Sequence, residues 1–156
     1  MGTQNPDVAG VVAIPPLIYL AFLGLGTLLE ILVPTDVLPI AVQLPLGILL
    51  ILTAAVPVTL AVRAFRNAGT PLDVRKPVTA LVTTGVFRFS RNPAYLALTL
   101  LYAGIAILAD SVWMLGLLLP VLWIMHAGVI VREERYLERR FGESYLHYKR
   151  AVRRWL

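Results

Sequence analysis

The sequence contains no cysteine, and this absence excludes several kinds of site at once. Disulfides, thiolate nucleophiles and thiolate metal ligands all require cysteine. The remaining strong metal ligands are two histidines, His126 and His147, which lie 21 residues apart and match no short metal-binding motif. We therefore expect no dedicated metal site.

Charged residues are also scarce: 15% of the 156 residues are charged and 58% are hydrophobic. Soluble domains have roughly 45–50% apolar residues. The alternation of strand and helix patterns that a soluble α/β enzyme needs is missing. The composition predicts an all-α integral membrane protein that forms one domain over residues 1–156.

Positive charge is absent from the first part of the chain, because no Lys or Arg precedes Arg63. All fourteen Lys and Arg residues fall within 63–91 or 132–154. Basic residues beside apolar spans are typical of cytoplasmic loops, and they also favour contact with anionic lipid headgroups. The net charge of +5 therefore indicates membrane lipids as a partner, and not nucleic acid.

Long apolar runs predict about four transmembrane helices, since a bilayer core needs roughly 20 apolar helical residues. The expected spans are 11–33, 40–62, 94–109 and 112–131. Residues 1–62 would supply two N-terminal spans, 63–93 a cytoplasmic connector, 94–131 a helical hairpin and 132–156 cytoplasmic or interfacial helices. Basic segments after the second and fourth spans place both termini in the cytoplasm.

Two local patterns refine this prediction. Asp110 and Ser111 separate the last two spans, which leaves room for only a tight hairpin in which one of them caps the returning helix. Near the end of the chain, a break at Phe141 and Gly142 precedes an amphipathic helix that should lie in the membrane interface, with its basic face toward lipid. Its apolar face carries Tyr145, Tyr148, Val152 and Trp155, and its basic face Lys149, Arg150, Arg153 and Arg154.

The polar residues concentrate at the open ends of the hairpin. A short turn between antiparallel helices brings those ends to one membrane face, so Asn92 and Tyr95 should lie near Arg132 and Glu133. One cytoplasmic pocket could therefore contain both segments.

The residues at these ends resemble a known family. The pattern T-T-G-V-F-R-F-S-R-N-P-A-Y-L is followed about forty residues later by R-E-E-R-Y-L-E-R-R-F-G-E-S-Y-L-H-Y-K-R-A-V-R-R-W. Both are similar to the C-terminal half of the isoprenylcysteine carboxyl methyltransferases and the related phospholipid methyltransferases. The resemblance covers roughly residues 79–156, and the first two spans carry no comparable signature.

The resemblance implies methyl transfer that depends on S-adenosylmethionine. By position in the family motifs, the cofactor would be bound by Thr79, Ala80, Leu81, Val82, Phe87, Asn92, Pro93, Ala94, Tyr95 and Glu133. Two positions depart from the family: Asn92 replaces the usual histidine and Phe87 the usual tyrosine. An asparagine does not titrate near neutral pH, so an imidazole role at position 92 is excluded.

A third departure concerns the methyl acceptor. The arginine that recognises the prenylcysteine carboxylate in the family corresponds to Val129, and Arg132 is the nearest replacement, almost one helical turn later. The acceptor therefore need not be a prenylcysteine carboxylate. We expect a small lipophilic or membrane-embedded molecule, which could be a carboxylate, an amine or a thiol. Glu133 could pair with the ammonium group of the cofactor, while Arg132 or Arg91 could orient an anionic acceptor.

Two other functions stay open. A sterol-reductase-like enzyme has a similar C-terminal half but uses NADPH, and a membrane scaffold or transport subunit would have no catalytic site.

Outside the proposed site, we expect His126 to be a hydrogen-bonded packing residue, Glu30 to cap or reach the interface, and Gly24-x-Gly26 to allow close helix packing.

Overall fold

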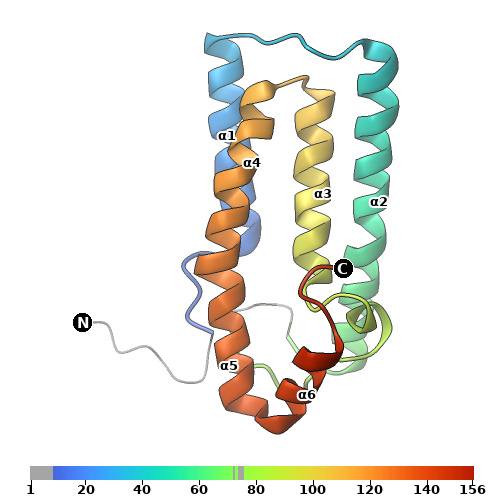
Figure 1. The fold of residues 1–156 in the computed structure, drawn as a ribbon, viewed down its shortest axis with the longest axis vertical. Helices are drawn as coiled ribbons and strands as arrows, with labels where there is room; N and C mark the ends of the chain where they lie inside the picture. The colour runs from blue at the N-terminus through green and yellow to red at the C-terminus, as the bar shows by residue number, and fades with distance from the viewer. Residues whose placement is uncertain (1–8, 72, 74–75) are drawn as a thin grey trace, which may run out of the picture.

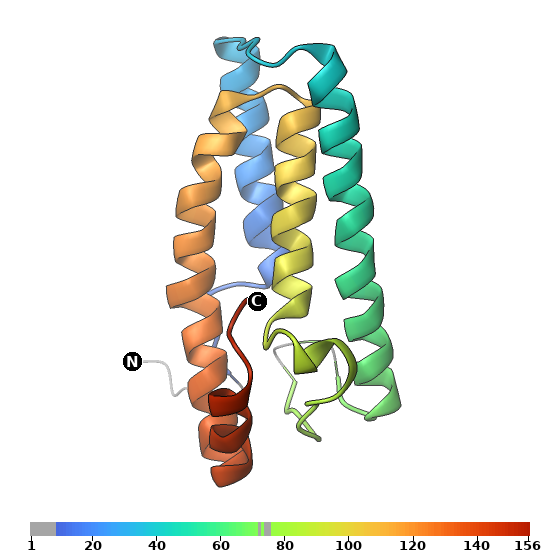
Figure 2. The same ribbon diagram turned by 45° about the vertical axis from the view of Figure 1, so that its right-hand side comes forward.

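The computed structural model describes residues 9–71, 73 and 76–156, and its ordered elements are all helical within these ranges. The chain forms an antiparallel bundle in which four long helical rods lie side by side (Figures 1 and 2). The first three rods are α1 (Pro15–Leu32), α2 (Ile40–Asn67) and α3 (Pro93–Leu108). The fourth comprises α4 (Val112–Ile124), a π-helical turn η2 (Met125–Ile130) and α5 (Val131–Phe141). A 3₁₀ turn η1 (Gly85–Arg88) precedes α3, and α6 (Glu143–Ala151) follows the bundle.

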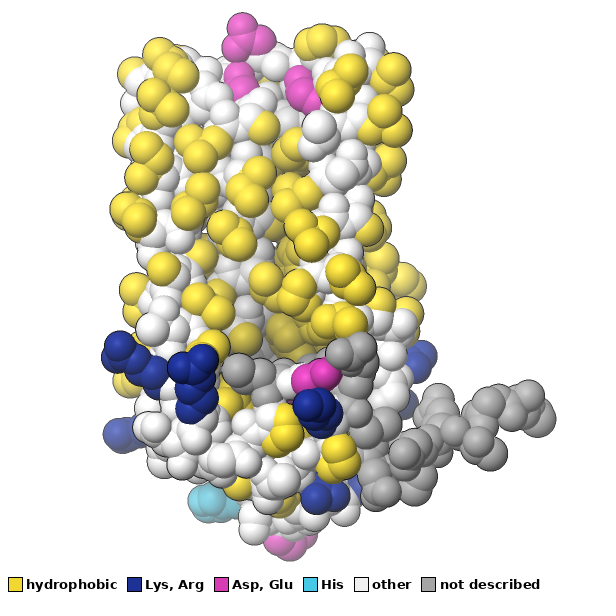
Figure 3. Space-filling model, turned by 180° about the vertical axis from the view of Figure 1, so that it is seen from behind, with side chains coloured by type: hydrophobic (Ala, Val, Ile, Leu, Met, Phe, Trp, Pro, Cys, Tyr) yellow, Lys and Arg dark blue, Asp and Glu magenta, His cyan; other side chains and the backbone are white. Residues whose placement is uncertain are grey.

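The apolar rods confirm the prediction of an integral membrane protein. Three helices are long and apolar enough to cross a membrane: Pro15–Leu32, Ile40–Asn67 and Val112–Phe141. α3 is a shorter apolar helix of 16 residues and would span about 24 Å, so it is the remaining candidate for a transmembrane segment. Figure 3 shows the hydrophobic side chains along the length of the bundle, acidic residues at one end and basic residues near the other. The expected connector begins later than predicted, because α2 continues to Asn67.

The acidic end of the bundle is held by polar contacts between two turns. The hydroxyl of Ser111 caps α4 by accepting a hydrogen bond from the Met114 N–H at 3.3 Å, as expected. The Asp110 carboxylate accepts hydrogen bonds from the N–H groups of Val37 at 2.8 Å and Leu38 at 3.1 Å. These bonds fix the α1–α2 connection to the α3–α4 turn, and Glu30 adds to them by accepting from Thr35.

Small residues allow the helices to approach closely. A Cβ on Gly26 would lie 2.5 Å from Met114 Cγ, so α1 meets α4 there, as the Gly24-x-Gly26 pattern predicted. Gly24 has no atom within 4 Å of such a Cβ, and its predicted role in packing was wrong. α2 and α3 also cross closely, where a Cβ on Gly104 would lie 3.0 Å from the Gly47 carbonyl oxygen.

Two buried clusters form the core. The larger one joins α1, α3 and the fourth rod around Tyr102 and Met125. The smaller one lies at the basic end and joins α2, η1 and α6 through Ala61, Phe87 and Tyr145. The apolar face of α6 therefore packs against protein, and its predicted contact with the membrane interface was wrong for that face. Tyr145 is only 2% exposed.

Candidate active site

The two polar motifs meet at the basic end of the bundle. Pro93 occupies the first turn of α3, which lets the chain turn into the helix directly after Asn92. The Tyr95 hydroxyl donates a hydrogen bond to Glu133 Oε2 at 2.7 Å, between α3 and α5. This contact confirms that the hairpin gathers both motifs at one place.

Two cavities open on this meeting point. The smaller has a volume of about 60 Å³ and lies between the segment 80–82, α5 and α6. The larger has a volume of about 440 Å³ and lies between the start of α1, α2 and α3, with a mostly apolar lining. Five residues line both cavities: Phe65, Phe87, Arg91, Asn92 and Glu133. These residues, called the shared wall below, lie between the small chamber and the large, mostly apolar one.

Most of the predicted cofactor residues line one of these cavities. Ala80, Leu81 and Val82 line the smaller one, and Pro93, Ala94 and Tyr95 line the larger one. Phe87, Asn92 and Glu133 belong to the shared wall. Thr79 lines neither cavity, because its hydroxyl donates to the Gly69 carbonyl at 3.1 Å and its N–H donates to Thr70 Oγ1 at 3.1 Å.

The structure does not bring Arg132 into the site. Its Nη1 donates to the Gly10 carbonyl at 3.0 Å on the outside of the fourth rod. Val129, at the position of the family's substrate arginine, is fully buried and lines neither cavity. Arg132 precedes Glu133 on α5, and successive residues of an α-helix point about 100° apart, so Arg132 faces away from the cavities that Glu133 lines.

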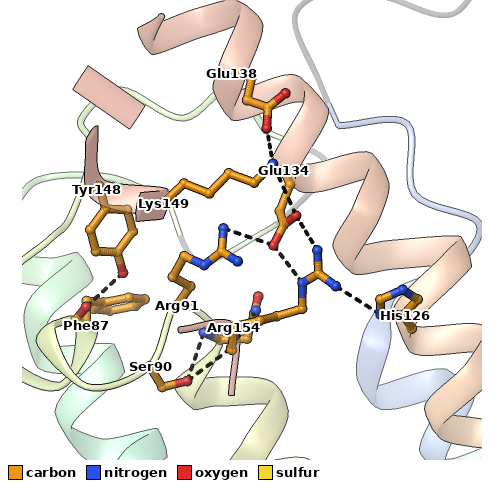
Figure 4. Close-up of polar contacts among 10 residues, drawn as sticks. Phe87, Ser90, Arg91, His126, Glu134, Glu138, Tyr148, Lys149 and Arg154 are labelled. Atoms are coloured by element: carbon orange, nitrogen blue, oxygen red, sulfur yellow. Dashed lines mark hydrogen bonds and ion pairs between the residues drawn. The ribbon is translucent and has the colours of Figure 1, made fainter. Parts of the chain in front are cut away.

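A second carboxylate, Glu134, forms the centre of a charged cluster (Figure 4). Arg154 donates to it twice, from Nε to Oε1 at 2.9 Å and from Nη2 to Oε2 at 2.8 Å. Arg91 Nη1 lies 3.3 Å from Oε1, and Lys149 Nζ lies 3.9 Å from Oε2 and also bonds Glu138. The hydrogen bond to Glu134 raises the pKa of Arg154 above its usual value, so this guanidinium stays charged.

The segment after α6, residues 152–156, is bound to the turn that precedes α3. The Arg91 N–H donates to the Arg153 carbonyl at 3.0 Å. The Arg154 carbonyl accepts from Asn92 Nδ2 at 3.0 Å and from the Ser90 hydroxyl at 3.3 Å. Asn92 therefore uses its side chain to hold this segment, while its backbone carbonyl accepts the first hydrogen bonds of α3. The lipid-facing role predicted for Arg154 was wrong.

The motif comparison missed Ser90 and Arg154 as residues of the site. Ser90 is 1% exposed, and its position two residues before the Asn-Pro start of α3 is the sequence signal that could have identified it. Arg154 follows the last turn of α6, where the helical periodicity no longer applies, so its direction has no sequence signal.

Aromatic side chains of α6 close the smaller cavity. Tyr145 and Tyr148 both line it, and the Tyr148 hydroxyl donates to the Phe87 carbonyl at 2.8 Å. Burial raises the pKa of Tyr148 to about 12, so its hydroxyl remains a hydrogen-bond donor at neutral pH. Gly142, with φ of +53°, provides the sharp turn that folds α6 back onto this site.

Other candidate positions lie apart from the shared wall. His126 forms a hydrogen bond with Arg154 Nη1 through Nδ1 at 3.5 Å, as expected, but it is exposed, so its predicted role in packing was wrong. Within the described part of the chain, no three His, Asp or Glu side chains gather in a way that could hold a metal ion.

Comparison with known proteins identifies a family. The phospholipid methyltransferase family model matches residues 42–144, which include most of α2, the first motif and the beginning of the second. The family signal therefore begins earlier than the resemblance in the motifs indicated. An uncharacterized protein of Haemophilus influenzae is 44% identical over 63 residues, which are 40% of this chain and 98% of that protein. No solved structure matches the chain. Because the family model covers well over half of the sequence, the chain belongs to the phospholipid methyltransferase family.

Proposed function

We propose that this protein transfers a methyl group from S-adenosylmethionine to a lipophilic acceptor at the membrane surface. The observation that carries this proposal is the shared wall. Phe87, Asn92 and Glu133, all at cofactor positions by family resemblance, separate a small chamber from a large apolar one. Because the same side chains line both chambers, a polar donor in one and a lipophilic acceptor in the other would lie next to each other, as direct transfer requires.

The donor set of the smaller chamber fits the cofactor. Glu133 accepts a hydrogen bond from Tyr95, and it forms no ion pair with any described residue. A partly buried carboxylate without a cationic partner is suited to bind an ammonium or sulfonium group. The ring of Phe87 could pack on the adenine. At about 60 Å³ this chamber is smaller than typical ligand pockets of roughly 300–1,000 Å³, so binding would require α6 to move outward.

The larger chamber fits the acceptor. Its volume of about 440 Å³ lies in the range of small-molecule sites, and Val58, Leu98 and Pro15 give it an apolar lining. Arg91 in the shared wall could orient an anionic group of the acceptor through its forked donors. We place Arg91 in this role in preference to Arg132, because Arg132 lines neither chamber.

The residues would act mainly by positioning and by excluding water. When bound, S-adenosylmethionine supplies a sulfonium methyl group, whose carbon–sulfur bond breaks, with its electron pair left on sulfur, as the acceptor nucleophile bonds to the carbon. Glu133 would hold the donor, Arg91 would align the acceptor, and Tyr145 and Tyr148 would keep bulk water out. A fixed general base is unnecessary for an anionic acceptor.

Binding of S-adenosylmethionine to the purified protein in detergent tests this proposal. We expect a dissociation constant in the micromolar range, raised about tenfold or more by Glu133→Gln because a charged contact is lost. Glu143→Gln is the matched control, since this carboxylate is exposed and lines neither chamber. Preference for NADPH would favour a reductase, and binding of neither cofactor would favour a membrane scaffold; either result would refute the proposal.

A further inference from the structure

Arg91 is a buried cation whose hydrogen-bonding capacity is only partly used. Its side chain is 9% exposed, and its Nε and Nη1 atoms have no hydrogen-bond partner among the described residues. The contact between Nη1 and Glu134 at 3.3 Å is an ion pair that lacks the geometry of a hydrogen bond. Buried donors are almost always satisfied, because an unmade bond costs free energy. Open donors in the wall of two cavities therefore point to a ligand that completes them.

Arg154, on the segment after α6, explains why these Arg91 donors have no hydrogen-bond partner. Arg154 donates to both oxygens of Glu134, at 2.9 and 2.8 Å, in the forked geometry that arginine and carboxylate prefer. This fork occupies the carboxylate that would otherwise pair fully with Arg91. Lys149 pairs closely with Glu138 and lies 3.9 Å from Glu134, so Arg91 and Arg154 are the two cations that share the Glu134 carboxylate.

The backbone fixes Arg154 in this position. Its carbonyl accepts hydrogen bonds from Ser90 and Asn92, on either side of Arg91 in the chain. The neighbouring carbonyl of Arg153 accepts from the Arg91 N–H. The segment that carries Arg154 is thus attached to the same turn that carries Arg91, and Figure 4 shows both guanidinium groups directed at Glu134.

We infer that Arg154 is a positioning residue, which holds Glu134 so that Arg91 remains free to bind the oxyanion of a ligand. The inference rests on the proposed function only for the identity of that ligand. The oxyanion is a carboxylate or phosphate, either from the amino-acid part of the cofactor or from the head of the acceptor. Without Arg154, Glu134 turns to Arg91 and competes with the ligand.

Ligand pairs that differ only in the oxyanion separate the two sources. S-adenosylhomocysteine carries the amino-acid carboxylate, and its decarboxylated analogue, 5′-deoxy-5′-(3-aminopropylthio)adenosine, keeps the nucleoside, thioether and ammonium without it. Oleate and oleyl alcohol are the corresponding pair for the apolar chamber. We expect Arg154→Gln to weaken binding of S-adenosylhomocysteine or of oleate about tenfold, and to leave binding of the partner without the oxyanion within twofold. Arg91→Gln should have the same selective effect.

A double variant distinguishes positioning from a structural role. In Arg154→Gln with Glu134→Gln the competing carboxylate is neutral, so we expect anion binding to return to within about threefold of the unchanged protein. Thermal unfolding in detergent identifies any variant that fails to fold, and in that case Arg154→Lys, which keeps the charge but loses the fork, replaces Arg154→Gln. Arg150→Gln is the control, since Arg150 is 72% exposed.

A double variant that binds the anion more weakly than Arg154→Gln would overturn the inference, as would equal losses for ligands with and without the oxyanion. Should neither nucleoside bind while the oleate series follows the expected pattern, the positioning role is supported and the proposed function fails. The two failures are therefore distinguishable.

Discussion

Two tyrosines of α3, Tyr95 and Tyr102, are both buried but differ in what their hydroxyl groups contact. The Tyr95 hydroxyl donates to Glu133, whereas the Tyr102 hydroxyl has no partner among the described residues. A hydrogen bond to a charged group contributes about 1.5–3 kcal/mol, and an unpaired buried hydroxyl costs about 1–3 kcal/mol. The same chemical change at the two positions should therefore have opposite effects.

We expect Tyr95→Phe to lower the thermal midpoint in detergent and to weaken S-adenosylhomocysteine binding about tenfold, because Glu133 loses its orienting donor. Tyr102→Phe should keep the affinity unchanged and leave the midpoint equal or higher. Differential scanning fluorimetry and equilibrium binding measure both quantities. Two variants that shift in the same direction by similar amounts would contradict this account of the site.

Asp110 gives the opposite end of the bundle a dependence on pH. The backbone N–H of Val37, followed by that of Leu38, lowers the pKa of this carboxyl below its ordinary value. A carboxyl whose pKa is lower in the folded state contributes stability above its unfolded pKa of about 3.9, and this stability is lost as pH falls through the folded pKa. We expect the unfolding midpoint to decrease below about pH 4 and to decrease less in Asp110→Asn. Identical pH profiles for the two proteins would exclude this role.

At the scale of the elements, the crossing of α2 and α3 depends on a glycine. A Cβ on Gly104 would lie 2.7 Å from Ile51 Cγ1 and 3.0 Å from the Gly47 carbonyl oxygen, which is backbone and cannot easily move. We expect Gly104→Ala to destabilise the protein by about 1–3 kcal/mol through overpacking. Gly116→Ala is the matched control: its Cβ would meet nothing within 4 Å, so it should be neutral or stabilising by up to about 1 kcal/mol. Equal unfolding midpoints for the two variants would contradict this packing.

The ends of the helices were the part of the fold that sequence patterns predicted well. Pro93 begins α3, Ser111 caps α4, and Gly142 separates α5 from α6, each for a local chemical reason. The π-helical turn Met125–Ile130 was not predicted, although Gly128 within it is a residue that weakens an α-helix. Arg132 was assigned to the site because it is the arginine nearest to position 129, but neither residue lines a cavity.

The contacts of α6 were also beyond sequence reasoning. Its amphipathic pattern indicates an apolar face but does not distinguish a membrane from a protein surface as the partner. The structure places Tyr145 and Tyr148 of that face over the smaller chamber, and the segment that follows places Arg154 on Glu134. Both outcomes depend on long-range contacts that form only when the turn at Gly142 folds α6 back.

For the whole molecule, the distribution of charge predicts its orientation. Basic residues gather at the end that holds the site, together with acidic ones, whereas the charged side chains seen at the end that holds the α1–α2 connection are all acidic (Figure 3). We expect the basic end to face the cytoplasm. The orientation is directly testable, because the sequence has no cysteine and an introduced cysteine would be its only thiol. Val37→Cys and Ser144→Cys are both at exposed positions, at the acidic end and on α6 respectively.

In intact cells a membrane-impermeant maleimide should label Val37→Cys and leave Ser144→Cys unlabelled until the membrane is opened. The opposite labelling pattern would reverse the orientation and place the site outside the cytoplasm. Equal labelling of both positions in intact cells would argue against a single orientation.

The central claim is that the Asn-Pro turn before α3 and the glutamate of α5 form one cofactor site. Its most direct test is photolabelling of the detergent-solubilised protein with tritiated S-adenosylmethionine, followed by peptide mapping. We predict label in peptides that contain residues 80–95 and 131–141, suppressed by excess S-adenosylhomocysteine. Label confined to other peptides, or labelling that S-adenosylhomocysteine does not suppress, would contradict the account.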